Sequence, residues 1–155
     1  MRVAVATDHA GFSLKEEVIA AVREAGHEVL DLGTWDEASV DYPDFAAAAG
    51  RALQRGEAER AIVLCGSGVG VSIAGNKLKG VYAGVCHDTY SAHQSVEHDH
   101  MNMLCLGSRV IGGELAKELV RAFLAAQPSQ EERHLRRIAK IVALEGSFCA
   151  GEGEK

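Results

Sequence analysis

The sequence lacks the features that mark membrane, exported and nucleic-acid-binding proteins. No apolar run approaches the ~20 residues of a membrane span. The opening residues contain no long apolar stretch followed by a small-residue cleavage site, so we expect no signal peptide. Basic residues are also outnumbered by acidic ones, 16 to 22. The formal net charge is -6, which argues against a broad nucleic-acid-binding surface because such surfaces need a basic footprint.

Closely spaced cysteine pairs are absent as well. The cysteines are Cys65, Cys86, Cys105 and Cys149. No two of them stand at C-x-x-C spacing, so neither a zinc ribbon nor a thioredoxin motif is supported. We expect free thiols and a cytoplasmic protein, because the cytosol keeps cysteine reduced. The histidines between residues 87 and 100 match no zinc pattern, and we expect no metal there.

The sequence does contain enough apolar material for one folded domain. Of its 155 residues, 47% are hydrophobic and 25% are charged, which is ordinary for a globular protein. Domains commonly span ~100–200 residues. We therefore expect a single domain over residues 1–145 and a flexible tail over residues 146–155.

Short apolar runs alternate with amphipathic segments along this domain. The runs predict strands at 2–7, 28–32, 61–65, 81–86 and 103–106. The amphipathic segments predict helices at 13–25, 44–54, 89–97, 113–126 and 131–144, and a further helix ending near residue 77. Ser13 stands where it would cap the first helix. This alternation indicates an α/β fold, with a parallel five-stranded sheet covered by helices on both faces.

A glycine-rich loop, residues 66–70, follows the third predicted strand. Its glycines allow positive φ and a close approach of the backbone to a ligand, and amides entering a helix favour anions. Val71 excludes the G-x-G-x-x-G dinucleotide motif and the C-x5-R phosphatase loop, and Asn76 excludes Walker A. The pattern predicts an anion site, with phosphate the natural guest; the alternative is a tight turn that binds nothing.

Other chemically useful residues follow predicted strands, at the edge of the sheet where parallel α/β proteins bind ligands. Cys65 stands beside the glycine loop, where amide dipoles stabilise a thiolate. It is either a nucleophile or base, or a buried inert cysteine. Asp8 and His9 follow the first strand. They could bind hydroxyls or phosphate, or serve as a capping residue and a surface histidine.

Basic and titratable side chains lie later in the chain. His98 or His100 could supply acid–base catalysis, because histidine titrates near neutral pH. Arg133 and Arg137 are four residues apart on a predicted helix, hence on one face. They could grip a phosphate together, and a solvated charged face is the alternative.

Taken together, these residues resemble the ribose-5-phosphate isomerase B family, which includes the galactose-6-phosphate isomerase subunits. The shared motifs are DHAG at 8–11, DYP at 41–43, CGSGVG at 65–70, NK at 76–77, YSA at 90–92 and LGSRVIG at 106–112. They stand in order along roughly residues 1–145. The resemblance implies a Rossmann-like fold without metal or cofactor. It also implies a homodimer or tetramer whose active site is shared between subunits.

The family's activity would make the substrate a phosphorylated sugar, with ribose 5-phosphate and ribulose 5-phosphate interconverted through an enediolate. Cys65 would be the base that moves the proton between C1 and C2, and His98 would open the sugar ring. The glycine loop would then hold the enediolate oxygens rather than phosphate. Its residues in this role would be Gly66, Ser67, Gly68, Val69 and Gly70.

The resemblance also implies a set of substrate-binding residues. His9, Arg133 and Arg137 would hold the phosphate, with the arginines and His98 supplied by the partner subunit. The sugar would be bound by Asp8, Tyr42, Asp99 and Arg109. Asp99 stands where the family commonly has asparagine, and an ionised carboxylate accepts hydrogen bonds but cannot donate them. The sugar preference is therefore open.

Three other readings stay open at this point. The chain could isomerise another sugar phosphate, such as allose 6-phosphate, galactose 6-phosphate or a tetrose phosphate. It could be a non-catalytic sugar-phosphate-binding module on the same fold, because a fold does not fix a function. A thiol phosphatase is the third reading, and the missing arginine at position 71 disfavours it.

Overall fold

Residues 1–149 are described by a computed structural model, in which five strands form one parallel sheet. The strands are β1 (Arg2–Thr7), β2 (Glu28–Asp31), β3 (Arg60–Cys65), β4 (Ala83–Val85) and β5 (Met103–Gly107). Their order in the sheet is β2-β1-β3-β5-β4, and every pairing is parallel. The predicted α/β fold with a parallel five-stranded sheet is confirmed.

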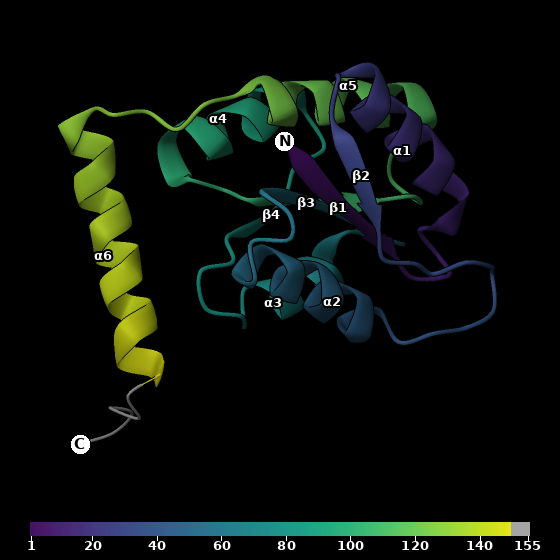
Figure 1. The fold of residues 1–155 in the computed structure, drawn as a ribbon, viewed down its shortest axis with the longest axis horizontal. Coiled ribbons are helices and arrows are strands. Elements are labelled where there is room, and N and C mark those ends of the chain that lie inside the picture. The colour runs from purple at the N-terminus through teal and green to yellow at the C-terminus, as the bar shows by residue number, and fades with distance from the viewer. Residues whose placement is uncertain (150–155) are drawn as a thin grey trace.

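Helices cover both faces of the sheet (Figure 1). The helices are α1 (Lys15–Glu24), α2 (Tyr42–Gln54), α3 (Val69–Gly75), α4 (Thr89–Asp99), α5 (Gly113–Ala125) and α6 (Glu132–Cys149). One face carries α1, α4 and α5, and the other carries α2 and α3. Figure 1 shows α6 standing beside this body rather than on the sheet. None of the helices within residues 1–149 has the length and apolar character needed to cross a membrane.

Alternate side chains of each strand point into two separate cores. The core under α1, α4 and α5 takes Val3, Val5, Ile62, Leu64, Leu104 and Leu106. The core under α2 and α3 takes Ala4, Ala6, Ala61, Val63, Cys65, Met103 and Cys105. Because the second set is mostly smaller, the alanine-rich α2 can pack close to the sheet. All six residues of β3 are buried, as expected for a strand covered on both sides.

Two predicted helix boundaries are wrong. Ser13 does not cap α1, because it lies within a short 3-10 helix, η1 (Phe12–Leu14), and the residue preceding α1 is Leu14. The last helix does not end at residue 144 but runs to Cys149. A glycine inside a helix costs only ~1 kcal/mol relative to alanine, so Gly146 does not end it. The rest of the predicted flexible tail lies outside the described residues.

The segment after β2 is fastened by a buried lysine. The Lys15 ammonium lies 2.9 Å from Asp31 Oδ1 and donates to the Thr34 carbonyl at 2.7 Å. It also lies 4.1 Å from the centroid of the Trp35 ring. The Thr34 amide in turn donates to the Thr7 carbonyl at the end of β1. These contacts hold the start of the β2–α2 segment against the strand end where Asp8 and His9 follow.

We expect Lys15→Met to lower the free energy of unfolding by about 2–3 kcal/mol, because it leaves the Asp31 carboxylate and the Thr34 carbonyl without their buried donor. Lys117 is the matched control, since its ammonium pairs with Glu114 at the surface and Lys117→Met should change little. Urea denaturation of the three proteins measures both effects. Equal losses in the two variants would contradict the role given to Lys15.

Candidate functional site

A cavity of about 550 Å³ opens at the carboxyl ends of the central strands. It is lined by Asp8, His9, Ala10, Tyr42, Cys65, Gly66, Ser67, Val69, Gly70, Arg109 and Val110. These residues come from the segments after β1, β3 and β5 and from the first residue of α2. Nine of them were candidate site residues on sequence grounds, so the fold brings together segments that are far apart in the chain.

Cys65 ends β3 and is buried at this cavity. The Gly68 amide donates to Cys65 Sγ at 3.1 Å, and the Val69 amide donates to Ser67 Oγ at 3.3 Å. Gly68 has φ +80, and a Cβ there would lie 3.2 Å from the carbonyl carbon of Leu106. Conformation and space therefore both favour glycine at this position. The loop thus directs one amide to the thiol and another to the Ser67 hydroxyl.

The turn after β5 is bonded to the Cys65 loop. The Ser108 amide donates to the Cys65 carbonyl at 2.9 Å, and the Arg109 amide donates to the Gly66 carbonyl at 3.0 Å. Ser108 Oγ donates to the Ala10 carbonyl at 2.6 Å. The segments that follow β1, β3 and β5 are thus cross-linked, and the Arg109 side chain is carried to the cavity wall.

The loop after β1 supplies a histidine with an assignable tautomer. The Val40 amide donates to His9 Nδ1 at 3.2 Å, so Nδ1 holds a lone pair and Nε2 carries the ring proton. That N–H is the donor that His9 can offer to an oxygen in the cavity. Asp8 Oδ1 accepts from the Gly11 amide at 2.9 Å. Asp8 therefore both caps its turn and lines the cavity.

Cys86 and Cys105 differ from Cys65 in their surroundings. Both are free, buried thiols outside the cavity lining. Burial raises the pKa of Cys86 and, more strongly, the pKa of Cys105. As buried thiols with raised pKa values, they suit a packing role in the core. Cys149 lies in the last turn of α6, and its side chain is outside the described part of the chain.

Five candidate residues do not line this cavity. Gly68 belongs to the loop and donates to Cys65, whereas the other four lie elsewhere, namely His98, Asp99, Arg133 and Arg137. Asp99 is the exposed last residue of α4. Arg133 forms an ion pair with Glu131 at 2.7 Å on the surface. Both arginines belong to α6, which stands beside the body in Figure 1. The site predicted from the sequence is therefore divided between two places in one chain.

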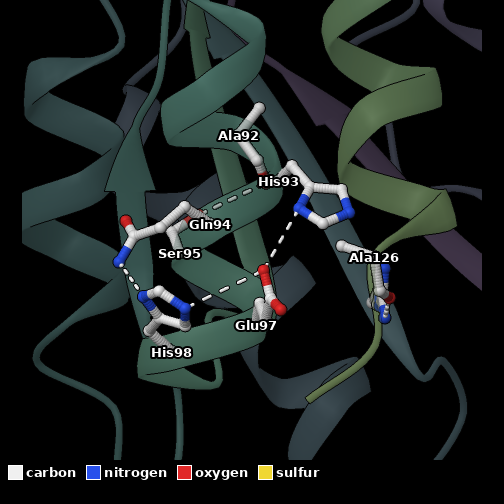
Figure 2. A network of polar contacts seen from close by, with 8 residues as sticks. Ala92, His93, Gln94, Ser95, Glu97, His98 and Ala126 are labelled. Atoms are coloured by element: carbon white, nitrogen blue, oxygen red, sulfur yellow. Dashed lines mark hydrogen bonds and ion pairs between the residues drawn. The ribbon is translucent and has the colours of Figure 1, made fainter. Parts of the chain in front are cut away.

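His98 belongs to a polar network on α4 (Figure 2). Gln94 Nε2 lies 2.8 Å from His98 Nδ1. The Glu97 carboxylate lies between two imidazoles, 3.8 Å from His98 Nε2 and 3.6 Å from His93 Nδ1. The His98 ring also stacks on the ring of His134, with 4.0 Å between centroids. This network holds the His98 ring in a defined orientation.

Several residues of the cavity and of the surroundings of His98 were not predicted from the sequence. Ala10 and Val110 line the cavity, and both lie inside motifs that had been recognised, so their position was a usable signal. His134 is buried with neither ring nitrogen hydrogen-bonded. Burial and the neighbouring His98 lower the pKa of His134. Its surroundings arise from the packing of α6 near α4, which no local pattern reveals.

The cavity combines a thiol, backbone amides, an N–H of imidazole and a guanidinium. A thiolate can take a proton from carbon, while amides and a hydroxyl stabilise negative charge on neighbouring oxygens. Within residues 1–149, no group of three or more His, Cys, Asp or Glu side chains is arranged to hold a metal ion. The groups present suit proton transfer next to a carbonyl.

Comparisons with known proteins agree with this chemistry. Residues 3–141 match the sequence profile of the Ribose/Galactose Isomerase family. Ribose-5-phosphate isomerase B of Escherichia coli K12 is 46% identical over 144 residues, which cover 93% of this chain and 96% of the relative. D-erythrulose-4-phosphate isomerase 2 of Mycolicibacterium smegmatis is 38% identical over 151 residues, with coverage of 95% and 99%. The solved structure of ribose-5-phosphate isomerase B from Clostridium thermocellum has a TM-score of 0.92 at 42% identity, covering 96% of this chain and 99% of that one.

We expect Gly107→Ala to lower the free energy of unfolding by about 1–3 kcal/mol, the usual range for overpacking. A Cβ at Gly107 would lie 2.6 Å from the carbonyl carbon of Ser67, so one of the two backbones must move. Gly112 has φ -92 and open space around it, and Gly112→Ala is the control that should leave stability nearly unchanged. Guanidinium denaturation compares them, and a neutral Gly107→Ala would contradict the tight contact.

Proposed function

The chain belongs to the ribose/galactose isomerase family, and on that premise we propose that it interconverts ribose 5-phosphate and ribulose 5-phosphate. It is a sugar-phosphate isomerase. The observation that carries the finer proposal is the position of Cys65, buried at the cavity with a loop amide donating to its sulfur. This thiol is the base of a reaction that needs no metal.

The proposed reaction moves one proton between adjacent carbons of the open-chain sugar. The Cys65 thiolate takes the proton from C2 of the aldose, and the electron pair left behind forms the enediolate. A proton also passes from the C2 hydroxyl to the C1 oxygen, and the thiol returns a proton to C1, which gives the ketose and restores the thiolate. The base is then ready for the next turnover, and no group of the protein is consumed.

Charge on the enediolate oxygens is stabilised by the loop after β3. The Ser67 hydroxyl accepts from the Val69 amide, so its own proton remains available for an enediolate oxygen. The Gly68 amide points at Cys65 Sγ and stabilises the thiolate when the proton has been returned. The loop thus stabilises both the enediolate and the Cys65 thiolate.

The remaining cavity residues bind the rest of the substrate. His9 offers Nε2–H to the phosphate, because Val40 occupies its other nitrogen. Arg109 adds a positive charge at the wall, and Asp8 accepts hydrogen bonds from sugar hydroxyls. Tyr42 closes one side of the cavity through its ring, since a Cβ at Gly70 would lie 2.8 Å from that ring.

We also propose that the active site is completed by a second copy of the chain in a homodimer or tetramer. His98, Asp99, Arg133 and Arg137 would reach the partner's cavity, because they lie outside the lining of the cavity that holds Cys65 in their own chain. In support, α6 lies beside the body rather than on a face of the sheet (Figure 1). It also exposes the apolar side chains Leu135, Ile141, Val142 and Leu144, which a partner would cover.

A tetrose phosphate is the second candidate substrate. The relative from Mycolicibacterium smegmatis is named D-erythrulose-4-phosphate isomerase 2 and matches over 95% of this chain. Asp99, in place of the more common asparagine, would contact the sugar and bears on this choice. The cytoplasm is the proposed location, in keeping with the three free thiols among the described residues.

Replacing the base tests the reaction. We expect Cys65→Ala to lower kcat by at least about a hundredfold, the usual contribution of a positioned base, while the protein still folds. Cys86→Ala is the matched control and should keep its activity, because Cys86 lies outside the cavity lining. Turnover of ribose, allose and galactose phosphates and of erythrose 4-phosphate is measured with EDTA present.

The panel of sugar phosphates distinguishes the candidate substrates and tests the metal-free mechanism. Highest turnover of ribose 5-phosphate, unaffected by EDTA, supports the metal-free pentose phosphate reaction. Preference for erythrose 4-phosphate moves the substrate and keeps the mechanism. Near-normal activity of Cys65→Ala would remove Cys65 from the mechanism, and inhibition by EDTA would contradict a metal-free reaction.

Mixed oligomers test the shared site. Cys65→Ala and Arg137→Ala chains are each expected to be inactive, yet co-expression should restore about a quarter of wild-type activity in a dimer, since random pairing leaves one intact site in each mixed dimer. The measurement is kcat of the purified mixture against the separate variants. A mixture as inactive as its components, with mixed dimers shown by mass spectrometry, would contradict the shared site.

A further inference from the structure

His87 lies outside the cavity lining but bonds the turn on which the cavity depends. It follows β4, at the carboxyl edge of the sheet, and its Nε2 accepts a hydrogen bond from the Gly107 amide at 3.0 Å. Gly107 is the last residue of β5 and begins the turn that carries Arg109. A side chain after the edge strand thus reaches the end of the neighbouring strand.

Gly107 and the turn after it are held tightly against the Cys65 loop, so the two segments must move together. Its Cα faces the backbone of Ser67 so closely that a Cβ would lie 2.7 Å from Ser67 Cα. The next two amides of the turn, from Ser108 and Arg109, donate to the carbonyls of Cys65 and Gly66. A hydrogen bond that fixes the position of Gly107 therefore also fixes the positions of the Cys65 thiol and the Ser67 hydroxyl.

The bond requires a neutral imidazole. Nε2 accepts from the Gly107 amide only while it carries no proton, so the ring proton is on Nδ1. Burial lowers the pKa of His87, which favours this neutral form. The acceptor is therefore in place at neutral pH.

We propose that His87 is a positioning residue of the isomerase. Its Nε2 anchors the Gly107 amide and thereby keeps Cys65 and Ser67 in the geometry that proton transfer needs. The kinetic part of this inference rests on the proposed function, whereas the anchoring bond can be tested without any substrate. His87 does not touch the reacting atoms, and its effect passes through the β5–α5 turn.

Three variants test the proposal. His87→Leu removes the acceptor, and His87→Gln offers an amide oxygen at a similar reach. His27→Leu is the control, because His27 lies in the turn between α1 and β2, at the opposite edge of the sheet. Steady-state kcat and KM are measured on the best sugar phosphate of the wild type, at a temperature where circular dichroism shows every variant folded. Amide hydrogen exchange at Gly107 is followed by NMR in each protein.

We expect kcat of His87→Leu to fall about tenfold with KM nearly unchanged, because a small misplacement of reacting groups costs rate. The Gly107 amide should exchange faster in this variant. His87→Gln should restore both the slow exchange and most of kcat, and His27→Leu should match the wild type. Rescue by glutamine would show that the acceptor, rather than the bulk of the ring, is what matters.

Several results would overturn the proposal. They are wild-type kcat in a folded His87→Leu, equal impairment of His87→Gln and His87→Leu, or an unprotected Gly107 amide in the wild type. If His87→Leu does not fold, His87→Asn replaces it, since its acceptor is too short to reach Gly107. A wild type that prefers another sugar phosphate changes the proposed substrate and leaves this test intact.

Discussion

Two backbone hydrogen bonds join the loop of Cys65 to the turn after β5, and the geometry of the cavity depends on them. The amides of Ser108 and Arg109 donate to the carbonyls of Cys65 and Gly66, continuing the parallel pairing in which Cys65 stands opposite Gly107. The thiol is thereby mounted on the sheet rather than on a free loop. Groups held by regular structure keep their geometry better than groups on loops alone.

The two-sided core explains why the cavity lies over β3. β3 is the central strand, buried throughout, and its smaller side chains face α2 and α3. Close packing of α2 on that face brings its first residue, Tyr42, against Gly70. The wall of the cavity therefore follows from the size of core side chains several residues away, and a larger residue in that core would push the wall outward.

Much of this arrangement could be predicted from the sequence. Each strand is a short apolar run, and the polar residues at its end, such as Asp8, His9 and Cys65, must meet at one edge of a parallel sheet. The strand order could not be predicted, because alternation does not say that β5 lies between β3 and β4. The contact of His87 with Gly107 depends on that order, so the sequence showed only a histidine in a histidine-rich stretch.

The start of α1 was predicted wrongly because of local contacts that the sequence pattern does not show. Ser13 stands at a suitable capping position, but Asp8 already accepts from the Gly11 amide, and the chain turns through η1 before α1 begins. The roles predicted for residues of α4 and α6 stay predictions, for a different reason. Nothing in a sequence says whether His98 or Arg137 serves the cavity of its own chain or that of a copy, because both arrangements carry the same residues.

The surface position of Arg133 is consistent with a phosphate-binding role in a partner's cavity. In this chain its guanidinium pairs with Glu131, and both side chains are 60% exposed. Exposed ion pairs contribute only ~0–1 kcal/mol, so exchanging Glu131 for a phosphate would cost little. Guanidinium–phosphate hydrogen bonds are stronger than neutral ones and can form in pairs. A buried ion pair would be harder to exchange, because breaking one leaves an uncompensated buried charge.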